Sequence, residues 1–74
     1  MKTKSNKKNY YDGRILEFKK VDEILVVWIA GDPFASFEVK RRSRGDIFAY
    51  GFNGDFSVSE IAKAKKIFRE YEEL

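Results

Sequence analysis

The chain has no cysteine, no histidine and no long run of apolar residues. The missing cysteine excludes disulfide bonds and thiolate metal ligands, and a small fold without disulfides fits a reducing compartment. The longest apolar run, residues 24–30, has seven residues, whereas a membrane-spanning helix needs about 20. No apolar segment follows the charged N-terminus, so we expect no signal peptide. These absences predict a soluble cytoplasmic protein that does not enter a membrane.

The lack of histidine and cysteine also limits the chemistry that the chain can perform. Acid-base or nucleophilic catalysis would depend on carboxylates, lysine, serine or tyrosine. Most aspartates lie beside turns, where their side chains bond nearby backbone amides: Asp12, Asp32, Asp46 and Asp55. The segment 51–55 lacks the lysine and the spacing of a phosphate-binding loop. We therefore expect no enzyme, with no catalytic residues, no metal site, no cofactor and no small-molecule substrate.

The length and the distribution of charge indicate one small domain with a basic tail. A chain of 74 residues is near the lower size limit for a self-sufficient core, so association with a partner is expected. Four of its 15 basic residues lie within the first nine positions, which leaves 11 basic against 12 acidic residues in the rest. We predict a flexible basic tail over residues 1–9 and a single domain over residues 10–74. The tail is either a solvated terminus or an arm that contacts phosphates.

Turn-forming residues divide the domain into four predicted strands and a helix. The turn signals lie at residues 11–13, 21–23, 31–33 and 42–45. Because the connections between strands are short, neighbouring strands should pair as antiparallel hairpins. The segment 24–30 is rich in strand-forming residues and apolar on both faces, so both of its faces need a cover.

A common register for the three hairpins assigns the faces of the predicted sheet, because residues opposite each other point to the same side. The closing pairs are Lys20 with Ile24, Ala30 with Ala35 and Arg41 with Asp46. One face then collects the predicted core: Leu16, Phe18, Ile24, Val26, Trp28, Phe37, Val39, Phe48, Tyr50 and Phe52. The opposite face keeps an apolar stripe with polar edges, typical of a protein interface: Leu25, Val27, Ile29 and Ile47. An alternative is that Tyr10, Tyr11 or Phe34 covers this stripe.

The C-terminal segment predicts an amphipathic helix that covers one face of the sheet. Ser57 and Glu60 have the spacing of a capping box, and Phe56 can pack onto Ile61. Apolar residues then recur within one arc of the helix: Ile61, Ala64, Ile67, Phe68, Tyr71 and Leu74. The predicted fold is α+β: a four-stranded antiparallel meander followed by one helix packed on one sheet face, ββββα. Glutamates crowd the helix C-terminus, where the macrodipole disfavours them, and either a basic partner or the lysine tail would account for them.

In the order of its elements, the chain over roughly residues 13–74 resembles the single-stranded-DNA-binding fold of the transcriptional coactivator family typified by positive cofactor four. That fold is a curved four-stranded sheet followed by an amphipathic helix that can mediate dimerisation. The resemblance lies in the topology and not in a sequence motif.

Basic residues gather at the tip of the third hairpin: Lys40, Arg41, Arg42 and Arg44. Arginine at this tip could form paired hydrogen bonds with phosphates. Alternatively, the charges could simply keep the hairpin solvated and prevent edge pairing. The aromatic content of 16% invites a platform for stacking bases, but the predicted register places Trp28, Phe48 and Tyr50 in the core.

Two functional hypotheses follow, with a structural or inhibitory role as a third option. The first is a small protein-interaction module, a homo-oligomer or a binder of another protein, that uses Leu25, Val27, Ile29 and Ile47 on the open sheet face. The second is a nucleic-acid-binding domain that uses the basic tip and tail, helped by two lysines of the helix. Its candidate residues are Lys40, Arg41, Arg42, Arg44, Lys63 and Lys66.

Overall fold

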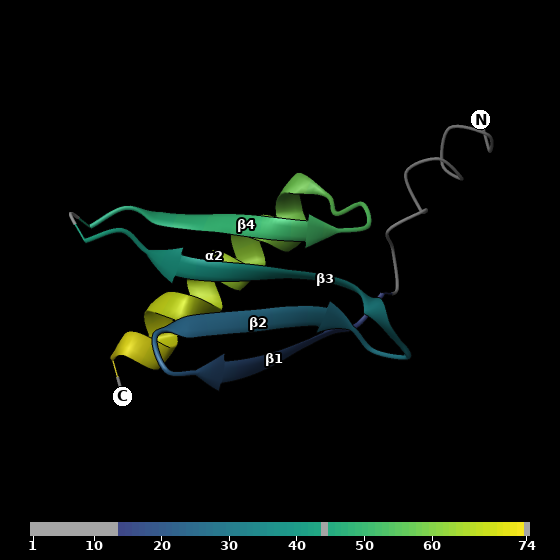
Figure 1. Ribbon diagram of the computed structural model, residues 1–74, viewed down its shortest axis with the longest axis horizontal. Coiled ribbons are helices and arrows are strands. Elements are labelled where there is room, and N and C mark those ends of the chain that lie inside the picture. The colour runs from purple at the N-terminus through teal and green to yellow at the C-terminus, as the bar shows by residue number, and fades with distance from the viewer. Residues whose placement is uncertain (1–13, 44, 74) are drawn as a thin grey trace.

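The computed structural model describes residues 14–43 and 45–73, which form one antiparallel sheet and one helix (Figure 1). The elements are β1 (Leu16–Val21), β2 (Ile24–Ile29), β3 (Asp32–Arg41), β4 (Ile47–Asn53) and α2 (Val58–Glu72). The strands are ordered β1-β2-β3-β4 in the sheet. The predicted ββββα fold of the α+β class is confirmed, whereas the predicted tail over residues 1–9 lies outside the described residues.

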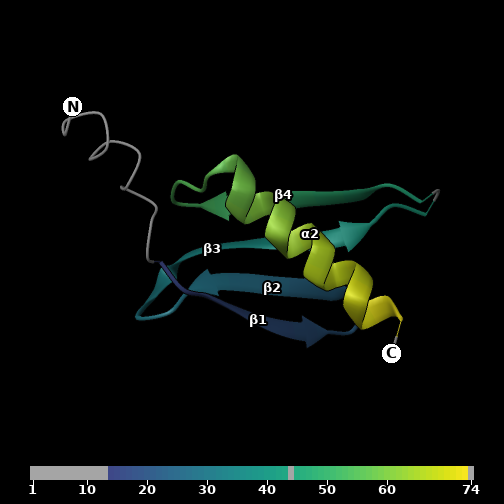
Figure 2. The same ribbon diagram turned by 180° about the vertical axis from the view of Figure 1, so that it is seen from behind.

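Helix α2 covers one face of the sheet and leaves the other without a second layer in the part of the chain that the structure describes. It runs diagonally across the sheet, on the viewer's side of the strands in Figure 2, and contacts β4, β3 and β1. Its fully buried side chains are Ala64 and Phe68. The small Ala64 side chain lets the helix backbone approach the sheet. The helix is neither long nor apolar enough to cross a membrane.

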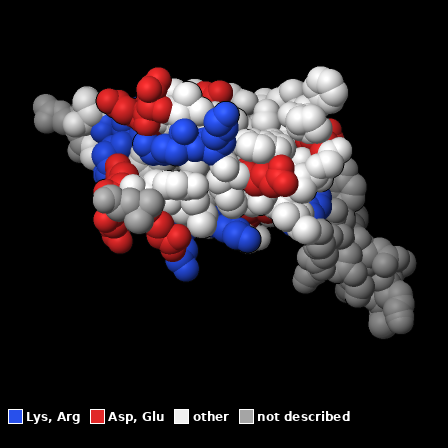
Figure 3. All heavy atoms as spheres, turned by 90° about the horizontal axis from the view of Figure 1, so that it is seen from below, with Lys and Arg blue, Asp and Glu red and all other residues white. Residues whose placement is uncertain are grey.

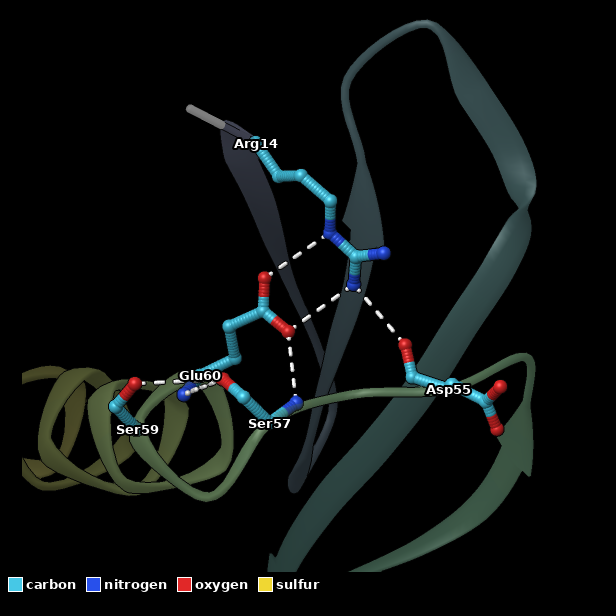
Figure 4. A network of polar contacts seen from close by, with 5 residues as sticks. All are labelled: Arg14, Asp55, Ser57, Ser59 and Glu60. Atoms are coloured by element: carbon cyan, nitrogen blue, oxygen red, sulfur yellow. Dashed lines mark hydrogen bonds and ion pairs between the residues drawn. The ribbon is translucent and has the colours of Figure 1, made fainter. Parts of the chain in front are cut away.

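The start of α2 has the predicted capping box (Figure 4). The Ser57 hydroxyl accepts a hydrogen bond from the Glu60 amide at 3.1 Å, and the Ser57 amide donates to Glu60 Oε1 at 2.9 Å. These bonds satisfy two of the backbone donors that a helix N-terminus leaves unpaired. Phe56 and Ile61 both pack against the core.

The predicted strand register is wrong by one residue in each hairpin. The first hairpin closes with Val21 opposite Ile24, around a two-residue turn in which Asp22 has a positive φ of 55°. Phe18 consequently faces Val27, where Val26 was predicted. The other two hairpins are also shifted by one residue. Their observed pairs include Val27 with Phe37 and Val39 with Ala49.

A shift of one residue exchanges the two faces of a strand. Here it exchanges the faces of β2 and those of β4 as far as Tyr50, whereas the irregular pairing of β3 with β4 between Ser36 and Glu38 leaves Phe52 on the side of Phe37. The predicted interface stripe is therefore wrong, because Leu25 and Val27 are 0% exposed and Ile29 is 8% exposed. Ile47 also packs against the core. Both strands are apolar on their two sides, so alternation could not show which side meets the helix. Of the three aromatic residues predicted as alternative covers, Phe34 is 81% exposed, and Tyr10 and Tyr11 lie outside the described residues.

The observed core lies between the sheet and α2. Its buried members are Leu25, Val27, Phe37, Val39, Ala64 and Phe68, with Leu16, Phe18, Ile47, Ala49, Phe56, Ile61 and Ile67 packed around them. Phe37 occupies the end of this core near the helix start. Its ring stacks on Phe52 at a centroid distance of 5.0 Å and meets the edge of Phe56 at 4.7 Å. Phe37, Val39 and Phe52 thus lie on the predicted side of the sheet.

Arg14, just before β1, joins the sheet to the helix start (Figure 4). Its Nε and Nη2 atoms donate to the two carboxylate oxygens of Glu60 at 3.1 and 3.0 Å. Nη2 also donates to the backbone oxygen of Asp55 at 3.0 Å, and the guanidinium carbon lies 5.3 Å from the centre of the Phe56 ring. A single side chain therefore holds the β4–α2 connection against the sheet.

Candidate functional site

The candidate site is the open sheet face, defined as the side of the sheet that points away from α2. Its side chains come from the positions that alternate with the core residues of each strand. They are Glu17, Lys19, Val21, Ile24, Val26, Trp28, Glu38, Lys40, Phe48 and Tyr50. Strands β2 and β4 contribute apolar and aromatic groups, whereas β1 and β3 contribute most of the charges. The open sheet face is thus amphipathic rather than uniformly polar.

Three aromatic side chains, which we call the aromatic platform, lie on this face: Trp28, Phe48 and Tyr50. All three are half-buried. The rings of Phe48 and Tyr50 are neighbours along β4, with centroids 5.5 Å apart and planes inclined by 39°. The prediction that these rings form the core beneath the helix is wrong, because the register shift turns them to the side that α2 does not cover.

Two basic side chains at the end of the third hairpin lie over the platform. Lys40 Nζ is 5.9 Å from the centre of the Phe48 ring and 5.3 Å from that of Tyr50. The guanidinium carbon of Arg42 lies 4.1 Å from the centre of the Phe48 ring. Such cation–π contacts are favourable and hold the cations beside the rings. Both basic side chains remain exposed, so positive charge and aromatic surface adjoin each other.

Glu38 lies in the middle of the open sheet face, on the inner strand β3. Its neighbours across the sheet are Val26 on β2 and Tyr50 on β4. Burial raises the pKa of the Tyr50 phenol, and the hydrogen bond between this phenol and the Glu38 side chain raises it further. The Tyr50 phenol is therefore protonated at neutral pH, and it lies beside the Glu38 side chain.

Arg41 points to the other side of the sheet, where it binds the end of the helix. Its Nη2 and Nε atoms donate to the carboxylate of Glu72 at 2.6 and 2.8 Å, and Nη1 donates to the backbone oxygen of Gly45. The hydrogen bonds between the two side chains raise the pKa of Arg41 and lower that of Glu72. This ion pair accounts for one of the glutamates that crowd the helix C-terminus.

The six basic residues predicted for nucleic-acid binding consequently do not form one site. Lys40 and Arg42 lie together on the open sheet face. Arg41 lies on the helix side, Lys63 and Lys66 are exposed on α2, and Arg44 lies outside the described residues. The shared hairpin suggested a single cluster, but successive residues of a strand point to opposite faces.

Charges of both signs are distributed along the edge of the molecule. Seen from below, lysine and arginine side chains gather toward one end of the protein, and acidic side chains lie beside them (Figure 3). The surface in this view is therefore not a continuous basic patch.

The described residues contain no group of three or more histidine, cysteine, aspartate or glutamate side chains that could hold a metal ion. Comparisons of the chain with protein-family models, with curated proteins and with solved structures find no match.

Proposed function

We propose that this protein is a non-enzymatic nucleic-acid-binding domain that binds single strands on its open sheet face. In this proposal bases stack on Trp28, Phe48 and Tyr50, and Lys40 and Arg42 contact the adjacent phosphates. The observation that carries the proposal is the position of Lys40 and Arg42 over the rings of Phe48 and Tyr50, on the face that the helix leaves uncovered.

The geometry favours a single strand over a duplex. Bases in a duplex are stacked on each other, whereas a single strand can turn its bases onto aromatic side chains. Each such stacking contact contributes about 1–3 kcal/mol, and basic side chains beside the rings follow the backbone. Arg42 suits both parts of the task, because a guanidinium plane stacks on rings and also forms paired hydrogen bonds with phosphate.

A titration with charge variants tests the proposal. Fluorescence anisotropy of a labelled 12-nucleotide single strand, at low and increasing salt, measures the affinity and its salt dependence. The double variant Lys40→Gln/Arg42→Gln should bind more weakly, and the slope of log K against log salt should decrease by about 1.4, because two phosphate contacts are lost.

The matched control removes two charges from the helix. Lys63→Gln/Lys66→Gln alters the net charge equally but leaves the open sheet face intact, so its affinity should stay close to that of the original protein. The absence of binding at low salt, or equal losses in the two double variants, would contradict the proposal.

Self-association through the open sheet face is the second candidate. In this candidate, the apolar part of the interface consists of Ile24, Val26 and Trp28. The stripe that was predicted from the sequence cannot serve, because it is buried. The observation in its favour is that Lys19 and Glu38 both lie opposite Val26, so that two copies related by a two-fold axis could bring opposite charges together. Sedimentation equilibrium at two salt concentrations tests this candidate. A monomer in both conditions would eliminate it.

The cytoplasm remains the proposed location. A small domain without cysteine gains nothing from an oxidising compartment, because it has no disulfide to form. Fractionation of cells that express the full chain measures the location directly, and recovery in the membrane or secreted fraction would contradict this proposal.

A further inference from the structure

We propose that Glu38 makes the open sheet face selective for bases that carry an exocyclic amino group, such as cytosine, over uracil or thymine. This inference rests on the proposed binding of single strands and concerns which strands bind. The Glu38 carboxylate lies beside Tyr50 of the aromatic platform, where a negative charge opposes the binding of a polyanion.

The surroundings of Glu38 keep its side chain on the binding surface. It is half-buried on the inner strand β3, with Val26 on one side and Tyr50 on the other. The Tyr50 phenol is the neighbour of the carboxylate on β4, and its interaction with Glu38 raises the pKa of the phenol. An ionised carboxylate has about four acceptor positions and no donor, so most of its capacity faces whatever covers the platform.

A base stacked beside Tyr50 would cover the Glu38 carboxylate and displace water from it. A charge that loses water without gaining a hydrogen bond is strongly unfavourable, so the bound base has to present an N–H donor. Cytosine offers its N4 amino group, which is the usual partner of glutamate in base recognition. Uracil has a carbonyl oxygen at this position, which would repel the carboxylate. Its N3–H donor lies between two carbonyl oxygens, so a carboxylate that accepts from N3–H is repelled by both.

The test compares oligodeoxycytidine with oligodeoxyuridine, both eight nucleotides long, at pH 7.5. The two bases have the same ring size and differ only along the N3–C4 edge, so stacking is closely matched. The original protein should bind oligodeoxycytidine about tenfold more tightly, since a good base contact discriminates by about 1–3 kcal/mol. In Glu38→Gln the preference should fall to about twofold or less, because an amide can donate to O4 as well as accept from N4.

Glu17→Gln is the matched control. Glu17 lies on the same face, opposite Trp28 on the edge strand β1, so this variant removes one negative charge from the open sheet face without changing the Tyr50 environment. Affinity for both oligomers should rise slightly and equally, and the tenfold preference should remain. Tyr50→Phe keeps the ring but removes the hydroxyl that orients Glu38, so it should weaken the preference while binding of oligodeoxyuridine persists.

The outcomes separate this inference from the proposed function. If neither oligomer binds at low salt, the proposed function and the selectivity assigned to Glu38 are both refuted. If both oligomers bind equally well to the original protein, the proposed binding of single strands is retained and the selectivity assigned to Glu38 is refuted. The same conclusion follows if Glu17→Gln reduces the preference as much as Glu38→Gln does. Circular dichroism of each variant verifies that the sheet is retained.

Discussion

Arg14 and Glu60 form a two-pronged ion pair that joins the chain before β1 to the first turn of α2. The same Glu60 oxygen that accepts from Arg14 Nη2 at 3.0 Å accepts from the Ser57 amide at 2.9 Å. The two side chains are only 21% and 11% exposed. One carboxylate therefore caps the helix and fixes the helix to the sheet, which keeps α2 on the face opposite the aromatic platform.

Substitutions at Glu60 separate these two tasks. Glu60→Gln can still cap the helix but loses the ion pair, so the free energy of unfolding should fall by about 1 kcal/mol. Glu60→Ala loses both interactions and should cost about 2 kcal/mol. Urea denaturation followed by circular dichroism measures both values. As a control, Glu70→Gln near the exposed helix end should change stability by less than about 0.5 kcal/mol. A similarly small effect for Glu60→Ala would contradict the dual role.

Neighbouring valines on β2 test which face of the sheet meets the helix. Val27 is 0% exposed beneath α2, whereas Val26 lies half-buried on the open sheet face. Val27→Ala should lower the free energy of unfolding by about 2 kcal/mol, because it leaves a cavity in the core. Val26→Ala should cost less than about 1 kcal/mol. If urea denaturation showed the larger loss for Val26→Ala, the result would contradict the observed register and support the one predicted from the sequence.

The element order and the helix could be predicted from the sequence because their signals are local. The capping residues Ser57 and Glu60 and the apolar arc with Ala64 and Phe68 lie within one short segment. The register depends instead on the exact length of each turn. A two-residue turn at Asp22 is the commonest hairpin connection, and that signal could have given the correct pairing of the first hairpin.

The candidate site was missed for the same reason. The three predicted hairpins agreed with one another, but each was shifted by one residue, so β1 and β3 kept their faces while β2 and, as far as Tyr50, β4 exchanged theirs. Trp28 and Tyr50 therefore moved from the predicted core to the open sheet face. The pairing of Tyr50 with Glu38 follows from the observed register, whereas the predicted register placed Phe37 opposite Tyr50. The contact of Arg14 with Glu60, 46 positions apart, has no local signal at all.

The Tyr50 phenol predicts a dependence of stability on alkaline pH. Burial and the hydrogen bond with Glu38 raise its pKa above the ordinary value of 10.0. The unfolded chain therefore loses this proton first, so the contribution to stability is complete below pH 10 and disappears as the pH rises through the pKa of the folded state. The Cζ chemical shift of Tyr50 measures this titration. In Glu38→Gln the pKa should move toward the ordinary value, and an unchanged pKa would exclude the hydrogen bond as a cause.

The Arg41–Glu72 ion pair predicts the opposite dependence at acidic pH. The hydrogen bonds from Arg41 lower the pKa of Glu72 below its ordinary value of 4.5. Its contribution is therefore present above pH 4.5 and is lost as the pH falls through the lowered pKa. The difference in melting temperature between the original protein and Glu72→Gln should accordingly shrink to zero on acidification. Glu73→Gln, next to it in the sequence, serves as the control. A difference that persists at low pH would contradict the role of the ion pair.

The most direct test of single-strand binding by the open sheet face uses the intrinsic fluorescence of Trp28, the only tryptophan in the chain. A base that stacks on this ring should quench its emission, with the same concentration dependence as the anisotropy of the labelled strand, and a duplex of equal length should cause much less quenching. If the single strand binds by anisotropy while the Trp28 emission stays unchanged, the strand binds elsewhere on the protein and the aromatic platform is not its site.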